Sequence, residues 1–370
     1  MHVAILCEYG SINGGENSLL AVLDHCPDDV QITVLAPPEG RFAEALKTRR
    51  LTHIPFSLHD NDGRRFPPIE AATLLAPVVE FVQPDLLHGN SLSTGRITGL
   101  LSQQTGMTCT AHLRDIISLS KTAIRHLNGN CKLIAVSHAT RDFHIEQGLD
   151  PDRVKVLYNG VDCERFQPRR GDGCLRRELE LDDDVLIALT IGQISMRKGL
   201  DVLVEAAVLH ASSLPQLHHV IVGVRHSSKP EAVAFEQGLH DRVEESGLTN
   251  RFHWLGYRDD IALLLNECDL LIHPARQEPF GRVLLEAAAS GVPIIATNVG
   301  GTTEILAPAK SGILIAPDNT DAIIASITLL TIEEPLRTRL GNNARDTIYS
   351  HFKIQDKASE ILMLWREAIS

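Results

Sequence analysis

Short apolar runs alternate with longer amphipathic segments from one end of the chain to the other. The sequence opens with the apolar run Val3–Cys7, continues through a glycine-containing loop at Gly10–Gly15, and enters a segment of helical periodicity from about Glu16 to Leu23. Short apolar runs are typical of strands buried on both faces, and apolar positions three or four residues apart are typical of helices. The pattern therefore predicts an α/β fold with parallel sheets. Further strands are expected at Gln31–Leu35, Leu86–Leu87, Thr108–Ala111, Leu133–Val136, Val154–Val156, Leu186–Thr190, His219–Val222, Phe252–Leu255, Leu270–His273 and Ile294–Ala296, and helices at Ile69–Val82, Thr94–Gln104 and Leu200–His210.

This alternation falls into two halves. A stretch rich in charge, glycine and proline, Phe166–Asp184, separates them, and a chain of 370 residues exceeds what one hydrophobic core usually serves. We expect a first domain at residues 1–167, a second at residues 168–350 and a C-terminal helix at residues 351–370. That helix corresponds to the amphipathic segment Lys353–Ala368, which contains Trp365.

Composition narrows the class of protein. The formal net charge of −12 argues against nucleic-acid binding, whose electrostatic footprint is basic, and gives no sign of strong attraction to anionic lipid. Seven cysteines are scattered without a C-x-x-C pair, which indicates neither a disulfide framework nor a zinc cluster. The sequence contains no apolar run of membrane-spanning length and no signal peptide, so we expect a cytoplasmic protein.

The stretch from Asp269 to Glu304 contains most of the candidate binding and catalytic residues. The sequence predicts a strand at Asp269–His273, a loop at Pro274–Gly281, a helix at Val283–Ser290 and a strand at Pro293–Thr297. These elements place two carboxylates. Glu278 is expected to cap the start of the helix, and Glu286 is expected to lie roughly 5–8 Å further along it. With ribose at Glu286, hexose at Glu278 and the diphosphate facing the helix amides, the geometry suits a nucleoside diphosphate sugar.

The spacing Glu278-x7-Glu286, followed by Gly291-Val292-Pro293 and Gly300-Gly301, resembles the retaining nucleotide-sugar glycosyltransferases of family 4. The residues Pro279, Phe280 and Gly281 after the first Glu belong to the same resemblance, which covers nearly the whole chain. It implies the GT-B fold, with two Rossmann-like domains facing across a cleft. It further implies that the first domain binds the acceptor, the second binds the nucleotide sugar, and the C-terminal helix crosses back to the first domain. The alternative is that Glu278 is a simple capping acid and Glu286 a solvated helix position.

Two loops are candidates for contact with the donor diphosphate. Gly14 and Gly15 lie between the first strand and helix, where bare backbone can approach a phosphate, although a tight turn explains them as well. Lys198, with Arg197 beside it, closes a loop after the first strand of the second half, where cations can neutralise a leaving diphosphate or simply be solvated. The family commonly has Arg at the start of this loop, where this chain has Gln193, so Arg197 is a candidate for the missing charge. The sequence contains neither a G-x-G-x-x-G motif nor a P-loop motif, which argues against a dehydrogenase and against a kinase.

In the family, a histidine at the strand end occupied here by His112 reaches the donor sugar, although a lone histidine is more often structural. We expect no metal site, because the acid run Asp182-Asp183-Asp184 precedes a strand and indicates a solvated turn. The expected catalytic residues are therefore His112, Lys198 and Glu278. The expected donor-binding residues are Gly14, Gly15, Arg197, Lys198, Glu278, Pro279, Phe280, Gly281 and Glu286.

The resemblance implies a hexosyltransferase that uses a nucleoside diphosphate sugar as substrate, needs no cofactor, and glycosylates a hydroxyl acceptor. Relatives build cell-surface polysaccharides, glycolipids and lipid-linked oligosaccharides, so the acceptor is expected to be a glycan or lipid-linked, and weak peripheral contact with the membrane stays open. Two alternatives remain: a catalytically silent nucleotide-sugar-binding subunit, which the Gln193 departure keeps open, and a GT-B sugar-nucleotide 2-epimerase.

Overall fold

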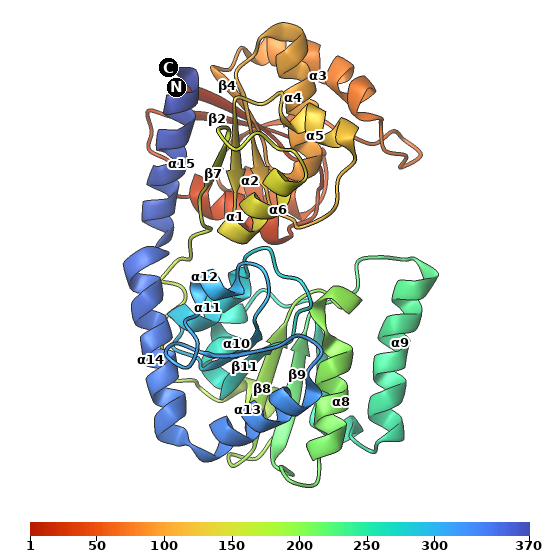
Figure 1. Cartoon of the computed structure of the whole chain (residues 1–370), viewed down its shortest axis with the longest axis vertical. Coiled ribbons are helices and arrows are strands. Elements are labelled where there is room, and N and C mark those ends of the chain that lie inside the picture. Colours follow the sequence, from red (N-terminus) through yellow and green to blue (C-terminus); the bar gives the residue numbers. More distant parts are fainter. The chain divides into compact units, whose positions relative to one another are not determined.

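The computed structural model describes all 370 residues and divides the chain into two compact units. Unit 1 consists of Met1–Gly160 together with Ile354–Ser370, and unit 2 consists of Val161–Lys353. Each unit is built on a parallel sheet with flanking helices (Figure 1), which confirms the α/β prediction. None of the helices combines the length and the apolarity that a membrane span requires.

The sheet of unit 1 has the strand order β3-β2-β1-β4-β5-β6-β7, and neighbouring strands are parallel. In β1, Val3 and Ile5 face one apolar core, whereas Ala4 and Leu6 face another. A strand covered on both faces needs apolar side chains at every position, which explains the continuous apolar runs in the sequence. The elements of unit 1 are β1 (His2–Leu6), α1 (Gly14–Leu23), β2 (Gln31–Ala36), α2 (Arg41–Thr48), β3 (Thr52–Pro55), α3 (Pro68–Val82), β4 (Leu86–Gly89), α4 (Leu92–Thr105), β5 (Cys109–Leu113), α5 (Lys121–Leu127), β6 (Lys132–Ala135), α6 (His138–Glu146), β7 (Val154–Val156) and α15 (Ile354–Ile369).

The sheet of unit 2 has the order β10-β9-β8-β11-β12-β13, again with parallel neighbours. Its elements are α7 (Cys174–Glu178), β8 (Leu186–Ile191), the 3₁₀ turn η1 (Met196–Lys198), α8 (Leu200–His210), β9 (Leu217–Val222), α9 (Pro230–Glu245), η2 (Thr249–Arg251), β10 (Phe252–Gly256), α10 (Ile261–Glu267), β11 (Leu270–His273), α11 (Arg282–Ala289), β12 (Ile294–Thr297), α12 (Thr302–Ile305), β13 (Ile313–Ile315), α13 (Thr320–Ile332) and α14 (Glu334–His351).

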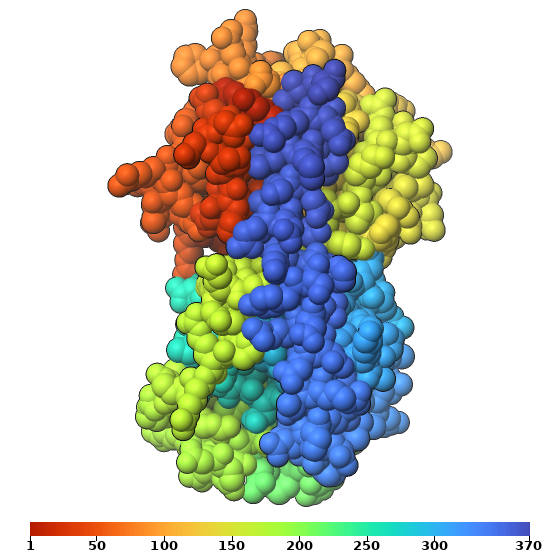
Figure 2. Space-filling model, turned by 90° about the vertical axis from the view of Figure 1, so that its left-hand side faces the viewer, coloured from red at the N-terminus to blue at the C-terminus, as the bar shows by residue number.

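The last helix, α15, is part of unit 1. Its Trp365 side chain is fully buried in the same apolar core as β1. Figure 2 shows the blue α15 lying between the red N-terminal segment and the yellow segments of unit 1. Ion pairs hold it on both sides, because Lys132 Nζ lies 2.5 Å from Glu367 Oε2 and Arg366 Nη2 lies 3.1 Å from Asp29 Oδ2.

The charged stretch that the sequence marks as a linker is ordered within unit 2. The chain passes from unit 1 to unit 2 after Gly160, earlier than the expected boundary at residue 168, and returns after Lys353. The stretch is held against α10: the backbone N–H of Arg169 donates to Asn266 Oδ1 (2.6 Å), and that of Gly173 donates to Glu267 Oε1 (2.8 Å). A composition rich in charge and glycine marks an irregular segment, but these two side-chain acceptors fix its backbone.

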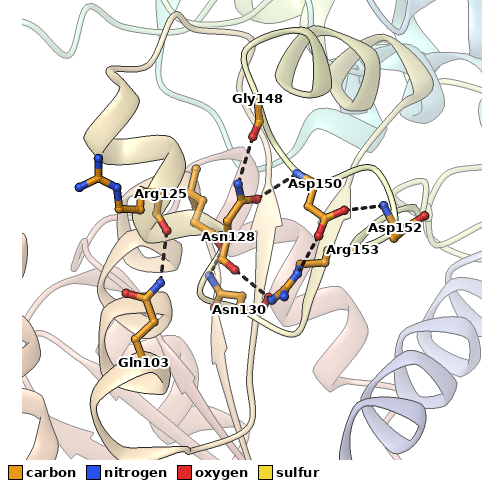
Figure 3. A network of polar contacts seen from close by, with 9 residues as sticks. Gln103, Arg125, Asn128, Asn130, Gly148, Asp150, Asp152 and Arg153 are labelled. Carbon is orange, nitrogen blue, oxygen red and sulfur yellow. Dashed lines mark hydrogen bonds and ion pairs between the residues drawn. The ribbon is translucent and has the colours of Figure 1, made fainter.

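A polar network ties two loops of unit 1 together at the amino-terminal ends of β6 and β7 (Figure 3). Asn128 donates from Nδ2 to the Gly148 carbonyl and accepts at Oδ1 from the Asp150 N–H, both at 3.0 Å. Arg153 donates from Nη1 to the carbonyl oxygens of Asn128 and Asn130, also at 3.0 Å. These hydrogen bonds join the two loops at the edge of the sheet opposite the carboxyl ends of the strands.

Candidate functional site

In each unit the strand order reverses at one place in the sheet. In unit 2 the chain runs outward from β8 to β9 and β10, then returns to place β11 on the other side of β8. Ligands of open α/β sheets bind outside the carboxyl ends of the strands that flank such a reversal. Lys198 follows β8 and Glu278 follows β11, so both predicted residues lie at this point.

The loop after β8 approaches the loop after β11 closely because residue 199 is glycine. Gly199 has a φ of +66°, and a Cβ atom there would lie 2.0 Å from the carbonyl oxygen of Pro274. A larger residue would combine backbone strain with a steric clash and push the loops apart. The glycine therefore holds the adjacent Lys198 against the residues that follow β11.

Lys198, His273 and Glu278 form a buried polar cluster. Lys198 Nζ lies 2.5 Å from Glu278 Oε2, and His273 Nε2 lies 2.8 Å from the same oxygen. The Glu278 side chain is 9% exposed. Its second oxygen, Oε1, makes no hydrogen bond within the protein and is not enclosed. This oxygen is therefore open to a hydrogen bond from a ligand hydroxyl.

The protonation states in this cluster follow from its geometry. Burial alone would raise the pKa of Glu278, but Lys198 and His273 together outweigh it and hold that pKa below its usual range. The pKa of His273 is lowered, first by burial and then by the charge of Lys198. At neutral pH Glu278 is therefore a carboxylate and His273 a neutral imidazole that donates to it from Nε2.

Glu278 does not cap α11, contrary to the expectation from sequence. The N-cap is Gly281, with a φ of +102°, which has no side chain to cap the first turn. Lys198 and His273 hold the Glu278 carboxylate instead. Phe280 is 2% exposed and its ring centroid lies 6.0 Å from that of Phe352, so the ring packs in the interior of unit 2. The neighbouring Pro279 is buried as well.

Glu286 lies within α11, as predicted, and forms an ion pair along the helix. Its Oε1 lies 2.9 Å from Arg282 Nη2, and the two side chains are 13% and 23% exposed respectively. Sequence reasoning missed Arg282, although the spacing of four residues on one helix face was a usable signal. Arg282 places a cation beside the carboxylate that is expected to hold the ribose.

Arg197 has different partners from Lys198. Its Nη1 donates to the Gln277 carbonyl at 3.4 Å, and its own carbonyl accepts from the Arg276 N–H at 2.8 Å. The structure thus brings Lys198 to the Glu278 carboxylate and Arg197 to the backbone just before it. Both cations lie in one loop at the reversal between β8 and β11.

Gly14 and Gly15 lie inside the first turn of α1 rather than in the loop before it, which corrects the expected start of that helix at Glu16. Asn13 is the N-cap, and its backbone N–H donates to Glu16 Oε2 at 3.0 Å in a capping box. A Cβ at position 15 would lie 3.2 Å from Arg114 Cδ, whereas a Cβ at position 14 would meet nothing within 4 Å.

His112 lies near the carboxyl end of β5 and belongs to a buried histidine pair. Its Nδ1 lies 2.8 Å from His88 Nε2, and His88 Nδ1 lies 2.8 Å from Thr110 Oγ1. Burial, followed by the charge of Arg114, lowers the pKa of His88 to about 3 and that of His112 well below its usual range. Sequence reasoning missed His88 as a partner, because nothing local in the sequence fixes the pairing of β4 with β5.

Three side chains of the kinds that bind metals come together elsewhere in unit 2. Asp172, Cys174 and Glu267 lie near the amino-terminal end of β11, opposite the edge that carries Glu278. Glu267 already accepts from the Gly173 N–H there. This group belongs to the packing of the segment before β8 and not to the cluster around Lys198.

Two family models match the chain in succession. The model described as Glycosyltransferase Family 4 matches residues 12–165, and that described as Glycosyl transferases group 1 matches residues 174–347. The D-inositol 3-phosphate glycosyltransferase of Stackebrandtia nassauensis is 36% identical over 313 residues, which are 77% of this chain and 68% of the relative. The lipopolysaccharide core biosynthesis mannosyltransferase LpsB of Rhizobium meliloti is 28% identical over 248 residues, 66% of this chain and 67% of the relative.

Solved structures of glycosyltransferases are similar to this chain over nearly its whole length. The structure of HepE from Anabaena in complex with UDP and glucose has a TM-score of 0.87 and 25% identity, and the match covers 98% of this chain and 99% of the other. Sucrose-phosphate synthase from Thermosynechococcus elongatus has a TM-score of 0.82 at 20% identity, over 99% and 98% of the two chains, which shows a common fold.

Proposed function

Because the chain belongs to the family 4 glycosyltransferases of the GT-B fold, we propose that it transfers a sugar from a nucleoside diphosphate sugar to a hydroxyl acceptor with retention of anomeric configuration. The observation that carries the proposal is the pairing of Lys198 with Glu278 at the strand reversal of unit 2. That pairing sets a fixed cation beside a carboxylate with one open oxygen, which suits a ligand that joins a phosphate to a sugar. The HepE structure with bound UDP and glucose supports the same donor class.

Each residue has a role in this proposal. Glu278 holds sugar hydroxyls through Oε1, and Glu286 holds the ribose hydroxyls. Lys198 and Arg197 compensate the charge of the diphosphate. Negative charge grows on the phosphate oxygens as the glycosidic bond breaks, and fixed donors aimed at that charge stabilise the transition state.

Further donor contacts come from backbone and from His112. Gly14 and Gly15 in the first turn of α1, and Pro279, Phe280 and Gly281 before α11, offer main-chain atoms, and His112 hydrogen-bonds the sugar. The acceptor oxygen bonds to the anomeric carbon on the face from which the diphosphate leaves, and the leaving phosphate takes the acceptor proton. In this front-face displacement no carboxylate acts as a covalent nucleophile. The donor is a substrate, and the reaction needs no metal and no further cofactor.

The names of the relatives favour an acceptor in surface-glycan synthesis. They include a lipopolysaccharide core mannosyltransferase and a galactosyltransferase acting on a diphosphoundecaprenol-linked sugar. We propose a glycan or lipid-linked acceptor that is bound by unit 1, and weak peripheral contact with a membrane when that acceptor is lipid-linked.

The decisive experiment incubates the protein with UDP-, GDP- and ADP-sugars in the presence of EDTA and measures nucleotide release, sugar identity and the anomeric configuration of the product. We expect release with one donor class, an unchanged sugar and retention. Binding without turnover would instead identify a silent subunit, and an altered sugar would identify a 2-epimerase. Activity lost in EDTA and restored by Mg²⁺ or Mn²⁺ would contradict the metal-free mechanism.

Replacing Glu286 with alanine should weaken nucleotide binding by about 1.5–3 kcal/mol, the range for hydrogen bonds to a charged group. The measurement is titration calorimetry with the free nucleoside diphosphate that the donor screen identifies. Glu205→Ala is the matched control, because Glu205 forms a comparable ion pair with Arg242 but both side chains are more than 40% exposed. Unchanged affinity in Glu286→Ala would remove Glu286 from the nucleotide site.

A further inference from the structure

Three buried polar side chains form a chain of hydrogen bonds across β4 and β5 in unit 1. His88 and Thr110 are partners in the register of these strands, and His112 lies two residues beyond Thr110 on the same face of the sheet. Thr110 Oγ1, the two nitrogens of His88 and Nδ1 of His112 are joined by contacts of 2.8 Å. The exposed fractions are 0% for His88, 1% for Thr110 and 4% for His112.

The direction of these hydrogen bonds follows from the number of partners at Thr110. Its hydroxyl makes a single hydrogen bond, to His88 Nδ1. If the hydroxyl accepted that bond, its own proton would be buried without an acceptor, which is unfavourable. The favourable arrangement has the Thr110 O–H donating to His88 Nδ1. His88 then carries its proton on Nε2 and donates to His112 Nδ1, which leaves the His112 proton on Nε2.

His112 Nε2 is the open end of the chain. It makes no hydrogen bond within the protein, and it is not among the enclosed polar atoms. We propose that Thr110 and His88 are positioning residues that lock His112 into the Nε2–H tautomer, so that His112 gives a hydrogen bond to an oxygen of the ligand and accepts none. We call the hydrogen bonds from Thr110 through His88 to His112 the relay. Without it, either nitrogen of the neutral His112 imidazole could carry the proton.

The surroundings keep the relay in one state. The Trp365 ring of α15 packs against His88, with ring centroids 5.4 Å apart, so the C-terminal helix holds the inner imidazole in place. Arg114, anchored by hydrogen bonds of 2.9 Å to the carbonyl and side-chain oxygens of Asn90, lies near both rings. Its positive charge opposes a second proton on either histidine, so the pair stays neutral and directional.

This inference rests on the proposed function, because it identifies which hydrogen bond His112 makes to the donor. A fixed N–H donor requires a lone pair on the sugar, so a donor lacking that oxygen should be rejected. It also removes His112 as the base for the acceptor proton, since Nε2 already carries a proton. The proton must therefore go elsewhere, which agrees with its transfer to the leaving phosphate.

The first test reads the tautomer directly in the free, full-length protein. ¹⁵N NMR of histidine-labelled protein, with His112 assigned by comparison with His112→Gln, should show Nε2 protonated and Nδ1 as an acceptor. The reverse pattern would overturn the inference whatever the enzyme does. Failure of the wild-type protein to turn over any nucleotide sugar would instead count against the proposed function, so the two failures are distinguishable.

The second test removes the hydroxyl that sets the direction. Thr110→Val should populate both tautomers of His112 and lower kcat about three- to tenfold, the loss typical of one neutral hydrogen bond. Thr110→Ser, which keeps the hydroxyl, should restore the single tautomer and the rate. A single Nε2–H tautomer in Thr110→Val would overturn the role of Thr110.

A second pair of variants tests His88 if the Thr110 variants do not fold. His88→Gln can accept from Thr110 and donate to His112, so it should keep the tautomer. His88→Leu should lose it. Equal kcat and equal tautomer populations in His88→Gln and His88→Leu would overturn the role of His88.

Discussion

Replacing Lys198 with alanine should lower kcat by about 10²–10³, the loss typical of removing one electrostatic donor from a developing negative charge. The charge on the leaving diphosphate grows as the glycosidic bond breaks, so a fixed cation stabilises the transition state more than the bound donor. Lys198 is suited to this role because Glu278, 2.5 Å away, and the close approach of Gly199 to Pro274 hold its ammonium group in place. Steady-state kinetics should therefore show a larger fall in kcat than in donor affinity.

Lys198→Ala also removes the partner of a buried carboxylate, so its kinetics must be measured on protein whose fold has been verified by circular dichroism. The exposed Lys229→Ala is the control for a general loss of positive charge. A loss of donor affinity with kcat unchanged would show that Lys198 binds the ground state and the transition state equally. An unchanged kcat would contradict the account of leaving-group stabilisation.

Arg197 tests whether a second cation compensates for Gln193. Arg197→Ala should lower kcat in the same way if Arg197 supplies the charge that relatives place at position 193. Adding Gln193→Arg in that background should then recover turnover, because both positions would serve one phosphate. No loss in Arg197→Ala would assign Arg197 to loop structure, where it already donates to the Gln277 carbonyl.

The fold was largely predictable because continuous apolar runs have one simple explanation in a sheet covered on both faces. β11 and α11 begin and end within one residue of their predicted positions. His273-Pro274 marks the end of the strand's apolar run, and Gly291 marks the end of the helical pattern. The strands that were missed, Thr52–Pro55 and Ile313–Ile315, are short and lie at sheet edges. Thr52–Pro55 contains polar residues and a proline, which edge strands tolerate, so it lacks an apolar run. Ile313–Ile315 is apolar but only three residues long, too short for periodicity to identify it as a strand.

The sequence singles out candidate site residues but not the pairs that they form. Lys198 and Glu278 could each be singled out from local motifs, but their contact spans 80 positions and depends on β8 and β11 being neighbours. The relay from Thr110 through His88 to His112 likewise depends on the register of β4 and β5. Sequence periodicity predicts which side chains share one face of a strand, but it does not predict which strand lies beside it. The protonation states in both clusters depend on those neighbouring strands.

Lowering the pH from 7 to 5 should cost the protein about 4 kcal/mol of folding free energy through two buried histidines alone. His88 in unit 1 and His219 in unit 2 are 0% and 3% exposed, and burial, reinforced by neighbouring positive charge, lowers the pKa of each to about 3. In the unfolded chain each has a pKa of about 6.5. Below that pH the unfolded chain binds protons that the folded chain cannot, so stability falls by about 1.4 kcal/mol per pH unit for each histidine until the folded pKa is reached.

Urea unfolding between pH 7 and pH 5 measures this dependence. His219→Phe should reduce the number of protons taken up on unfolding by about one, and so make the dependence of stability on pH less steep. Phenylalanine keeps an aromatic ring beside Phe252, whose ring centroid lies 4.8 Å from that of His219. The exposed His351→Gln is the matched control for the loss of one histidine. His219 Nδ1 is buried without a hydrogen-bond partner, so its replacement also removes an unsatisfied polar atom and should raise stability at neutral pH. A slope that is the same in wild type and His219→Phe would show that His219 is protonated in the folded state. Its burial would then not govern the acid sensitivity of unit 2.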